Sequence, residues 1–332
     1  MDISSIGKQG LINRLVSDIK PKPQHSSTIK GIGDDAAILC YGKTNLAVTT
    51  DTLVEGINFD LTYFPLQHLG YKAASVGFSN LYAMNALPRQ LFVSIAVSSK
   101  FSVESIETLY MGIKHCCERH RVDLAGGDTV TSITGLIITV TAIGEVKPTN
   151  AVYRNTAQKG DFICVSGDLG AAYMGLQILE REKKIFLEDR SIQPQLEAYK
   201  HVVGRQLRPK ARRDIIDFFS SVNLKPTSMI DISNGLSSEL LQICNSSKVG
   251  CEIYSHKIPI ADDTITAVEE FSLEPIIVAL NGGDDFELLF TIKATDYDKV
   301  AANNDISIVG YVTHHTDGFY LVSEGGSRIE IR

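Results

Sequence analysis

The stretch that decides the fold of this chain is Gly31-Ile-Gly-Asp-Asp-Ala-Ala-Ile-Leu39, where two neighbouring carboxylates stand in a glycine-framed turn beside an apolar run. The same design, a carboxylate with glycine or hydroxyl residues at the end of an apolar run, recurs along the chain. Carboxylates are costly to gather in one place unless a cation joins them. We therefore predict turns that together hold divalent metal ions and phosphate. The further segments are Thr49-Thr-Asp-Thr52, Gly126-Gly-Asp-Thr129, Asp231-Ile-Ser-Asn-Gly235 and Gly282-Gly-Asp-Asp-Phe-Glu287.

Each segment taken alone has a simpler explanation, because Asp–Gly pairs form turns and Asp is a common helix N-cap. Five such segments, each ending a strand-like run, favour a shared site instead. A carboxylate at the carboxyl end of a strand points into the crevice where α/β proteins bind ligands. Asp231 and Ser233 share one segment and offer two side-chain oxygens of the kind that Mg²⁺ prefers.

Residues beside the other carboxylates add oxygen atoms or room for a phosphate. Asp51 is flanked by Thr49 and Thr50, whose hydroxyl and carbonyl oxygens are further possible ligands. Gly127 precedes Asp128, and a backbone without side chains lets a phosphate group approach closely. Because Mg²⁺ takes about six oxygens, several of them from phosphate and water, these segments could hold several ions.

The composition is that of a soluble globular protein. The chain has 332 residues, of which 44% are hydrophobic and 21% charged, and this length is enough for two domains. The net charge of −7 argues against electrostatic binding to nucleic acid or a membrane surface. No apolar run approaches the roughly 20 residues of a membrane span, and no charged leader with an apolar core opens the chain. We expect no nucleic-acid partner and no membrane attachment.

The six cysteines contain no C-x-x-C pair and lie mostly in apolar contexts. This pattern is typical of reduced, buried thiols, so we expect a cytoplasmic protein. The cysteines are Cys40, Cys116, Cys117, Cys164, Cys244 and Cys251.

The chain alternates strand and helix patterns on both sides of the polar segment Lys147-Pro-Thr-Asn150. We place a domain boundary there, which gives domains of residues 1–149 and 150–332. Both contain strand–acidic turn–helix units, so the expected fold class is α/β, of the α+β type. The expected strands are 46–51, 90–98, 135–146, 161–166, 228–232, 286–292, 306–312 and 318–322, and the expected helices are 66–86, 103–120, 171–184, 193–207, 209–220 and 236–246.

Taken in order, these motifs resemble the thiamine-monophosphate kinase family, of the superfamily of aminoimidazole-ribotide synthetase and selenophosphate synthetase. The resemblance runs from about Gly7 to the final strands, and no single motif carries it alone. The matching segments are Gly-Ile-Gly-Asp-Asp-Ala-Ala, Thr-Thr-Asp-Thr-Leu-Val-Glu-Gly, Tyr71-Lys-Ala73, Ala-Gly-Gly-Asp-Thr, Asp-Ile-Ser-x-Gly-Leu and Gly-Gly-Asp-Asp-Phe-Glu-Leu.

The resemblance implies a two-domain synthetase-superfamily fold. Its N-terminal α/β domain pairs its sheet with that of a second copy in a homodimer, and its C-terminal α/β domain has a mixed sheet. ATP lies in a cleft between the domains, near the dimer interface. The implied reaction is direct in-line transfer of the γ-phosphoryl group of ATP to thiamine monophosphate, assisted by several Mg²⁺ ions.

The resemblance also implies site residues. A guanidinium can grip phosphate oxygens with two hydrogen bonds, which suits Arg154. The implied metal ligands are Asp35, Thr49, Thr50, Asp51, Asn80, Asp128, Asp231 and Asn234; the ATP-binding residues are Tyr110, Gly127, Asp128, Arg154 and Ser233; the substrate-binding residues are Asn58 and Asp284; and the catalytic residues are Asp51, Asp128, Asp231 and Arg154.

The chain departs from the family pattern at four positions. Asn80 and Asn234 stand where the family has aspartate, so each position loses a charge while keeping a carbonyl oxygen. Asn58 replaces a histidine and Asp284 a glutamate, both on the substrate side. The aromatic C-terminal segment of some members has no match before Arg332.

Two other readings remain open at this point. A related synthetase could act on another substrate, although a selenophosphate synthetase should carry a reactive cysteine before Cys40 and the hydrogenase-maturation relative should end in cysteine, whereas this chain ends in Ile331-Arg332. A non-catalytic nucleotide-binding paralogue is the other reading, and the uncharged Asn80 and Asn234 motivate it.

Overall fold

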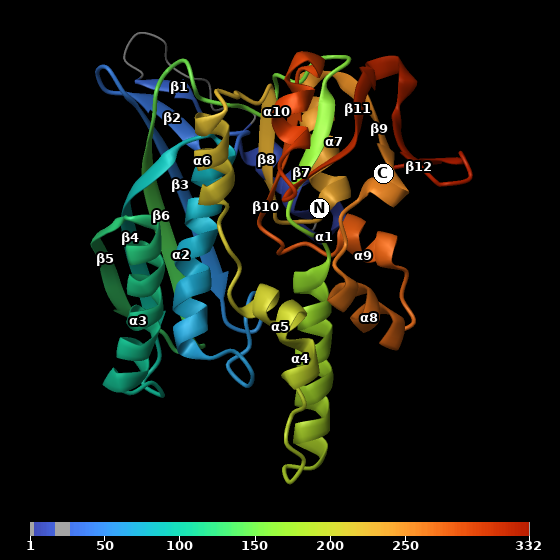
Figure 1. Cartoon of the computed structure of the whole chain (residues 1–332). Helices are drawn as coiled ribbons and strands as arrows, with labels where there is room; N and C mark the ends of the chain where they lie inside the picture. The colour runs from blue at the N-terminus through green and yellow to red at the C-terminus, as the bar shows by residue number, and fades with distance from the viewer. Residues whose placement is uncertain (1–2, 17–26, 332) are drawn as a thin grey trace.

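The computed structural model describes residues 3–16 and 27–331 (Figure 1). It has two β-sheets with helices between and around them, and the first sheet ends at Val146 while the second begins at Phe162. This confirms the α/β class with two sheets, and the strand-free interval contains the boundary placed at residue 149, which stays a prediction. No helix among the described residues combines the length and the apolar character needed to cross a membrane.

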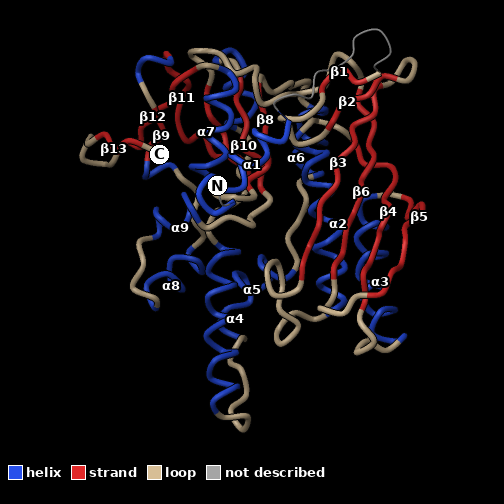
Figure 2. The backbone as a smooth tube through the Cα atoms, turned by 180° about the vertical axis from the view of Figure 1, so that it is seen from behind, coloured by secondary structure: helices blue, strands red, loops and turns tan. Residues whose placement is uncertain are grey.

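The first sheet is covered by helices on one face only. Helices α2 and α3 pack on that face, and Figure 2 looks onto the opposite, open face. Neighbouring strands are antiparallel except for the parallel pair β4–β5. The strand order is β1 (Thr28–Lys30), β2 (Ala37–Cys40), β3 (Asn45–Val54), β6 (Ile137–Val146), β4 (Leu87–Val97) and β5 (Asp123–Thr131); the helices are α2 (Leu66–Ala83) and α3 (Val103–His120).

Two glycines allow α2 and α3 to pack backbone against backbone. A Cβ atom on Gly70 would lie 1.9 Å from the carbonyl oxygen of Leu109, and one on Gly112 would lie 1.8 Å from that of Gln67. Any side chain at either position would therefore separate the two helices. The close contact fixes α2, which also contacts the second sheet at β8.

The second sheet is mixed, with β12 parallel to β9 and its other pairs antiparallel. Helix α4 projects away from the body of the molecule (Figure 1). The strand order is β13 (Arg328–Glu330), β12 (Phe319–Val322), β9 (Val249–Tyr254), β11 (Ile306–His314), β7 (Phe162–Ser166), β10 (Glu287–Ile292) and β8 (Ser228–Ile232); the α-helices are α1 (Ile3–Val16), α4 (Ala171–Glu188), α5 (Lys200–Leu207), α6 (Arg213–Ser221), α7 (Leu236–Ser247), α8 (Asp262–Glu270), α9 (Pro275–Asn281) and α10 (Tyr297–Ala301).

Several predicted boundaries were wrong. The helix expected over 66–86 ends at Ala83, and that expected over 193–207 begins only at Lys200, after a 3₁₀ turn. The helix expected over 209–220 begins at Arg213. Proline lacks an N–H group and restricts the residue before it to extended conformations, so Pro209 favours the extended connection between α5 and α6.

Two of the acidic segments are not turns. Thr49–Thr52 lies inside β3, and Gly126–Thr129 lies inside β5, a strand that was not predicted. Every residue of β5 is exposed, so its sequence lacks the alternation of apolar and polar residues that identifies a half-buried strand. The carboxylates of these two segments therefore project from a sheet surface.

Candidate active site

Three of the predicted carboxylates converge where α2 meets both sheets. Asp51 comes from β3, Asp35 from the turn before β2, and Asp231 from β8. Burial raises the pKa of Asp231 well above its usual value, and the neighbouring charges of Asp35, Glu239 and Asp51 raise it further. Burial also raises the pKa of Asp35. The structure thus gathers negative charge in a buried place, as the quoted segments predicted.

Arg154 is the cation that faces this cluster. Its Nε and Nη2 donate to the two carboxylate oxygens of Asp35 at 3.0 and 2.5 Å, and its Nη1 donates to Oε1 of Gln242 at 2.7 Å. Burial raises the pKa of Asp34 to about 6, and the charge of Asp35 adds to the rise. The residue predicted to grip phosphate is therefore held in this structure by a residue predicted to bind metal.

Side chains of α2 hold the other two carboxylates. Asn80 Nδ2 donates to Oδ2 of Asp51 at 2.8 Å and to Oγ1 of Thr49 at 3.3 Å. Ser79 Oγ donates to Oδ2 of Asp231 at 2.8 Å. The hydrogen bond from the amide nitrogen of Asn80 thus stabilises the charged form of Asp51 without neutralising it, and the amide oxygen of Asn80 is of the kind that can bind a metal ion.

The turn after β8 is fastened to α7. Glu239 Oε1 accepts hydrogen bonds from the backbone N and from Nδ2 of Asn234 at 3.1 and 2.7 Å. Ser233 Oγ lies 3.4 Å from the same oxygen. Gln242 Nε2 donates to Glu239 Oε2 at 2.6 Å and so connects this turn to Arg154. Glu239 and Gln242 were not predicted, although their spacing of three residues on one helix face is a recognisable signal.

Other predicted residues lie outside this cluster within one chain. Gly127 and Asp128 are exposed on β5, which β6 and β4 separate from β3 by about 14 Å at ordinary strand spacing. Asp128 lies opposite Ser94 on the open face of the sheet, and Thr50 lies on that face too, opposite Thr141. Their proposed roles, like those of the clustered residues, stay predictions.

The glycine at position 127 has a structural reason to be there. A Cβ atom would lie 1.7 Å from the carbonyl oxygen of Val93 on the neighbouring strand.

Two further predicted residues, Tyr110 and Asn58, also have structural contacts. Tyr110 on α3 is partly buried against the core, and this burial raises its pKa. Asn58 accepts a hydrogen bond from the backbone N of Val54 at 2.9 Å, so it closes the turn after β3.

Asp284 lies in a turn with unusual backbone geometry between α9 and β10. Its φ angle is +59°, and those of Gly283 and Phe286 are +74° and +53°. The carboxylate accepts a hydrogen bond from Nζ of Lys72 on α2 at 2.8 Å. Lys72 was not predicted as a site residue, although a lysine within the largely apolar sequence of α2 was a signal that it has a polar partner.

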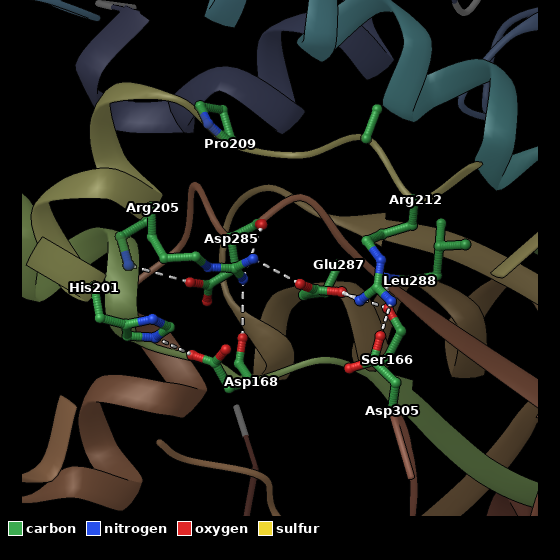
Figure 3. Close-up of polar contacts among 12 residues, drawn as sticks. Ser166, Asp168, His201, Arg205, Pro209, Arg212, Asp285, Glu287, Leu288 and Asp305 are labelled. Carbon is green, nitrogen blue, oxygen red and sulfur yellow. Dashed lines mark hydrogen bonds and ion pairs between the residues drawn. The ribbon is translucent and has the colours of Figure 1, made fainter. Parts of the chain in front are cut away.

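Behind this turn lies a dense group of ion pairs between α5, the 208–212 connection and the second sheet (Figure 3). Glu287 accepts hydrogen bonds from Arg205 Nη1 at 2.8 Å and from Ser166 Oγ at 2.6 Å, and it also pairs with Arg212. Arg212 further pairs with Asp305. The two arginines, Glu287 and Asp305 border a cavity of about 610 Å³, and their opposite charges largely neutralise one another.

Asp285 in the same turn is buried and has different hydrogen-bond partners from Asp284. It accepts hydrogen bonds from the backbone N of Gly170 at 2.9 Å and of Ala172 at 3.3 Å. Burial raises its pKa to about 7, although Arg205 and these two donors lower it.

Asp285 should make stability depend on pH. An unfolded aspartate has a pKa near 3.8, so between about pH 4 and 7 the folded protein keeps a proton that the unfolded chain has lost. The contribution of Asp285 is therefore greatest below about pH 4 and falls as the pH rises through 7. In Asp285→Asn this fall is absent, so the melting temperature of the variant minus that of wild type should increase across this range. A difference that stays constant with pH would contradict the assignment.

Comparisons with known proteins agree with this geometry. Residues 33–146, which include the first turn and most of the first sheet, match the family model described as AIR synthase related protein, N-terminal domain. This part of the chain is therefore similar to the N-terminal domain of AIR synthase related proteins.

The chain belongs to the thiamine-monophosphate kinase family. It is 33% identical over 310 residues to thiamine-monophosphate kinase of Bacillus subtilis, an alignment that covers 91% of each chain. The Aquifex aeolicus kinase is 32% identical over 292 residues, with 88% of this chain and 87% of the relative covered. A solved structure of AaThiL complexed with AMPPCP and TMP matches with a TM-score of 0.83 and 29% identity, over 99% of this chain and 97% of that chain.

Proposed function

We propose that this protein is an ATP-dependent kinase that converts thiamine monophosphate to thiamine diphosphate. The observation that carries the proposal is the match over nine-tenths of the chain to thiamine-monophosphate kinases, one of whose structures contains AMPPCP and TMP. The buried carboxylates opposite Arg154 supply a site of suitable chemistry. Products would be thiamine diphosphate and ADP.

The acceptor needs no general base in this reaction. A phosphate monoester has a second pKa of about 6, so its attacking oxygen is already ionised at neutral pH. The difficulty is to bring two anions together in line. Arg154 would release Asp35 and grip phosphate oxygens, while Ser233, Tyr110, Gly127 and Asp128 would contact the nucleotide.

The side chains of the acidic cluster are of the chemical kind that binds Mg²⁺. Among the residues that the structure describes, no three His, Cys, Asp or Glu side chains already form a group that could hold a metal ion. Yet the cluster offers only oxygen ligands, and the mutual repulsion of Asp35, Asp51 and Asp231 favours a cation between them. Bound Mg²⁺ would neutralise phosphate charge in the ground state and in the transition state. Proposed ligands are Asp35, Thr49, Thr50, Asp51, Asn80, Asp128, Asp231 and Asn234.

The function is tested by incubating the purified protein with ATP, MgCl₂ and thiamine monophosphate and separating the products by chromatography. Thiamine diphosphate that appears in step with ADP supports the proposal and shows that Asn80 and Asn234 are compatible with turnover. ATP binding without thiamine diphosphate would contradict it and would favour a related synthetase or a nucleotide-binding paralogue.

We also propose that the open face of the first sheet is the interface of a homodimer. Phe92 is 36% exposed on this face and Val130 on β5 is 52% exposed. Exposed apolar side chains on a sheet with an uncovered edge strand are typical of an interaction surface. Pairing two such faces would bring Asp128 of each copy to the interface.

Phe92→Glu should therefore convert a dimer into a monomer, because a charge would be buried without a partner. Light scattering coupled to size-exclusion chromatography measures the mass directly. Met111→Glu is the matched control, since Met111 is 53% exposed on α3, away from the open face. A wild-type protein with the mass of one chain, or a Phe92→Glu variant that stays dimeric, would contradict the proposed interface.

A cytoplasmic location is proposed on the cysteines alone. All six are free; Cys40 is exposed and the other five are buried. Five buried, unpaired thiols are typical of a reducing compartment.

A further inference from the structure

One face of α2 carries three buried polar side chains, which we name the α2 polar stripe: Lys72, Ser75 and Ser79. Their exposed fractions are 2%, 0% and 0%. Spacings of three, four and seven residues place them on the same side of the helix. Each forms hydrogen bonds with the C-terminal part of the chain, so the stripe joins the two sheets.

The hydrogen bonds of the two serines account for their burial on this face of α2. Ser79 donates to Asp231, as described above. Ser75 Oγ donates to the carbonyl oxygen of Pro209 at 2.9 Å and accepts from the backbone N of Ala211 at 3.0 Å. These bonds hold the connection between α5 and α6 against α2.

Lys72 differs from the two serines because it carries a charge, and its ammonium group contacts Asp284 in the turn between α9 and β10. An ammonium group has three hydrogen-bond donors, and the partners of Nζ are Asp284 Oδ2 at 2.8 Å and Gln206 O and Oε1 at 3.3 and 3.5 Å. The Phe64 ring centroid lies 5.7 Å away. With its donors directed to protein atoms, Lys72 is poorly placed to bind a phosphate itself.

Asp284 is built to present one oxygen outward. Its side chain is 43% exposed although Lys72 is buried. Its backbone N donates to Ser233 O at 2.9 Å, which fixes the turn to the end of β8. Among the hydrogen bonds of the described residues, Oδ1 of Asp284 has none, so this oxygen can accept a hydrogen bond from a ligand.

We propose that Lys72 is a positioning residue that fixes the Asp284 carboxylate for recognition of the phosphate acceptor. The acceptor group recognised is an N–H donor or a cationic ring, because a carboxylate held at one oxygen offers only an acceptor and a negative charge at the other. This inference rests on the proposed function and adds to it a residue that does not touch the substrate. A left-handed backbone at Asp284 is costly for a residue with a side chain, and Lys72 supplies a side-chain anchor for it.

The test compares Lys72→Met with Ser75→Ala. Removing the charge of Lys72 should raise the KM for thiamine monophosphate about tenfold, because the half-exposed Asp284 carboxylate would lose the charge-assisted hydrogen bond that holds it in place. The KM for ATP should stay close to wild type. Lys72→Arg keeps the charge and should restore part of the loss. Ser75→Ala, a change on the same stripe without contact to Asp284, should lower the melting temperature and leave both KM values unchanged.

Asp284→Asn supplies a second measurement should Lys72→Met fail to fold. It removes the same ion pair from the exposed side, and it should raise the acceptor KM without changing that for ATP. Lys72→Gln, which keeps hydrogen-bond donors without charge, should do the same. An unchanged acceptor KM in a folded Lys72 variant would overturn the positioning role, even with a lower melting temperature. Absence of turnover in wild type would instead refute the function, so the two failures are distinct.

Discussion

Asp51→Asn is expected to lower kcat by about 100- to 1000-fold, the usual effect of removing one preorganised electrostatic contact at a site where charge develops. Asp51 accepts a hydrogen bond from Asn80, and its charge raises the pKa of the buried Asp231. An amide is isosteric but brings no negative charge to the cations that phosphoryl transfer needs. Turnover should be measured at saturating MgCl₂, so that weaker metal affinity alone does not explain the loss.

The fold should survive this change, because the variant removes repulsion from an acidic cluster. We expect the melting temperature of Asp51→Asn to equal or exceed that of wild type. Asp123→Asn is the matched control, since Asp123 is an exposed aspartate at the start of β5, and it should keep wild-type kcat. Near wild-type kcat in Asp51→Asn would show that Asp51 is not a ligand of the catalytic metal.

The largest expected effect on stability comes from Arg212→Met. Arg212 is 5% exposed and pairs with Glu287, which is 1% exposed. Loss of one partner of a buried pair leaves a charge without compensation, and this costs about 3 to 5 kcal/mol of unfolding free energy. Urea unfolding followed by circular dichroism measures the loss.

Arg89→Met is the control for this effect. The side chains of Arg89 and Glu145 are 46% and 49% exposed, and solvent-exposed pairs contribute at most about 1 kcal/mol. Equal destabilisation by the two variants would mean that the ion pairs in Figure 3 add no more than surface pairs do. Arg205 remains beside Glu287 in Arg212→Met, so an effect at the lower end of the range is consistent with the proposal.

The sequence was sufficient to predict the carboxylates of the cluster, because each belongs to a local pattern. Asp35, Asp51 and Asp231 all stand beside apolar runs with glycine or hydroxyl neighbours. Their convergence depends instead on α2, which lies between two sheets whose strands are far apart in the chain. No local pattern records that arrangement.

The unpredicted parts have identifiable physical causes. Strand β5 has no buried face to generate a period of two, and its two glycines read as a turn. The partners Arg212 and Glu287 are 75 residues apart, so nothing in either neighbourhood indicates the other. Lys72 had the clearest signal of the missed residues, because a charged side chain within a buried helix requires a partner.

The close backbone contact between α2 and α3 means that α2 cannot accept an inserted or deleted residue without moving its C-terminal side chains. Because Gly70 packs against the backbone of Leu109, and Gly112 against that of Gln67, rotation of the N-terminal half of α2 about its axis would break both contacts. One residue inserted between Ser75 and Ser79 would turn everything after it by about 100° and advance it by about 1.5 Å. Lys72 would still reach Asp284, but Ser79 and Asn80 would no longer face Asp231 and Asp51. The number of residues between Lys72 and Asn80 on α2 therefore fixes the position of the Asp284 turn relative to the acidic cluster.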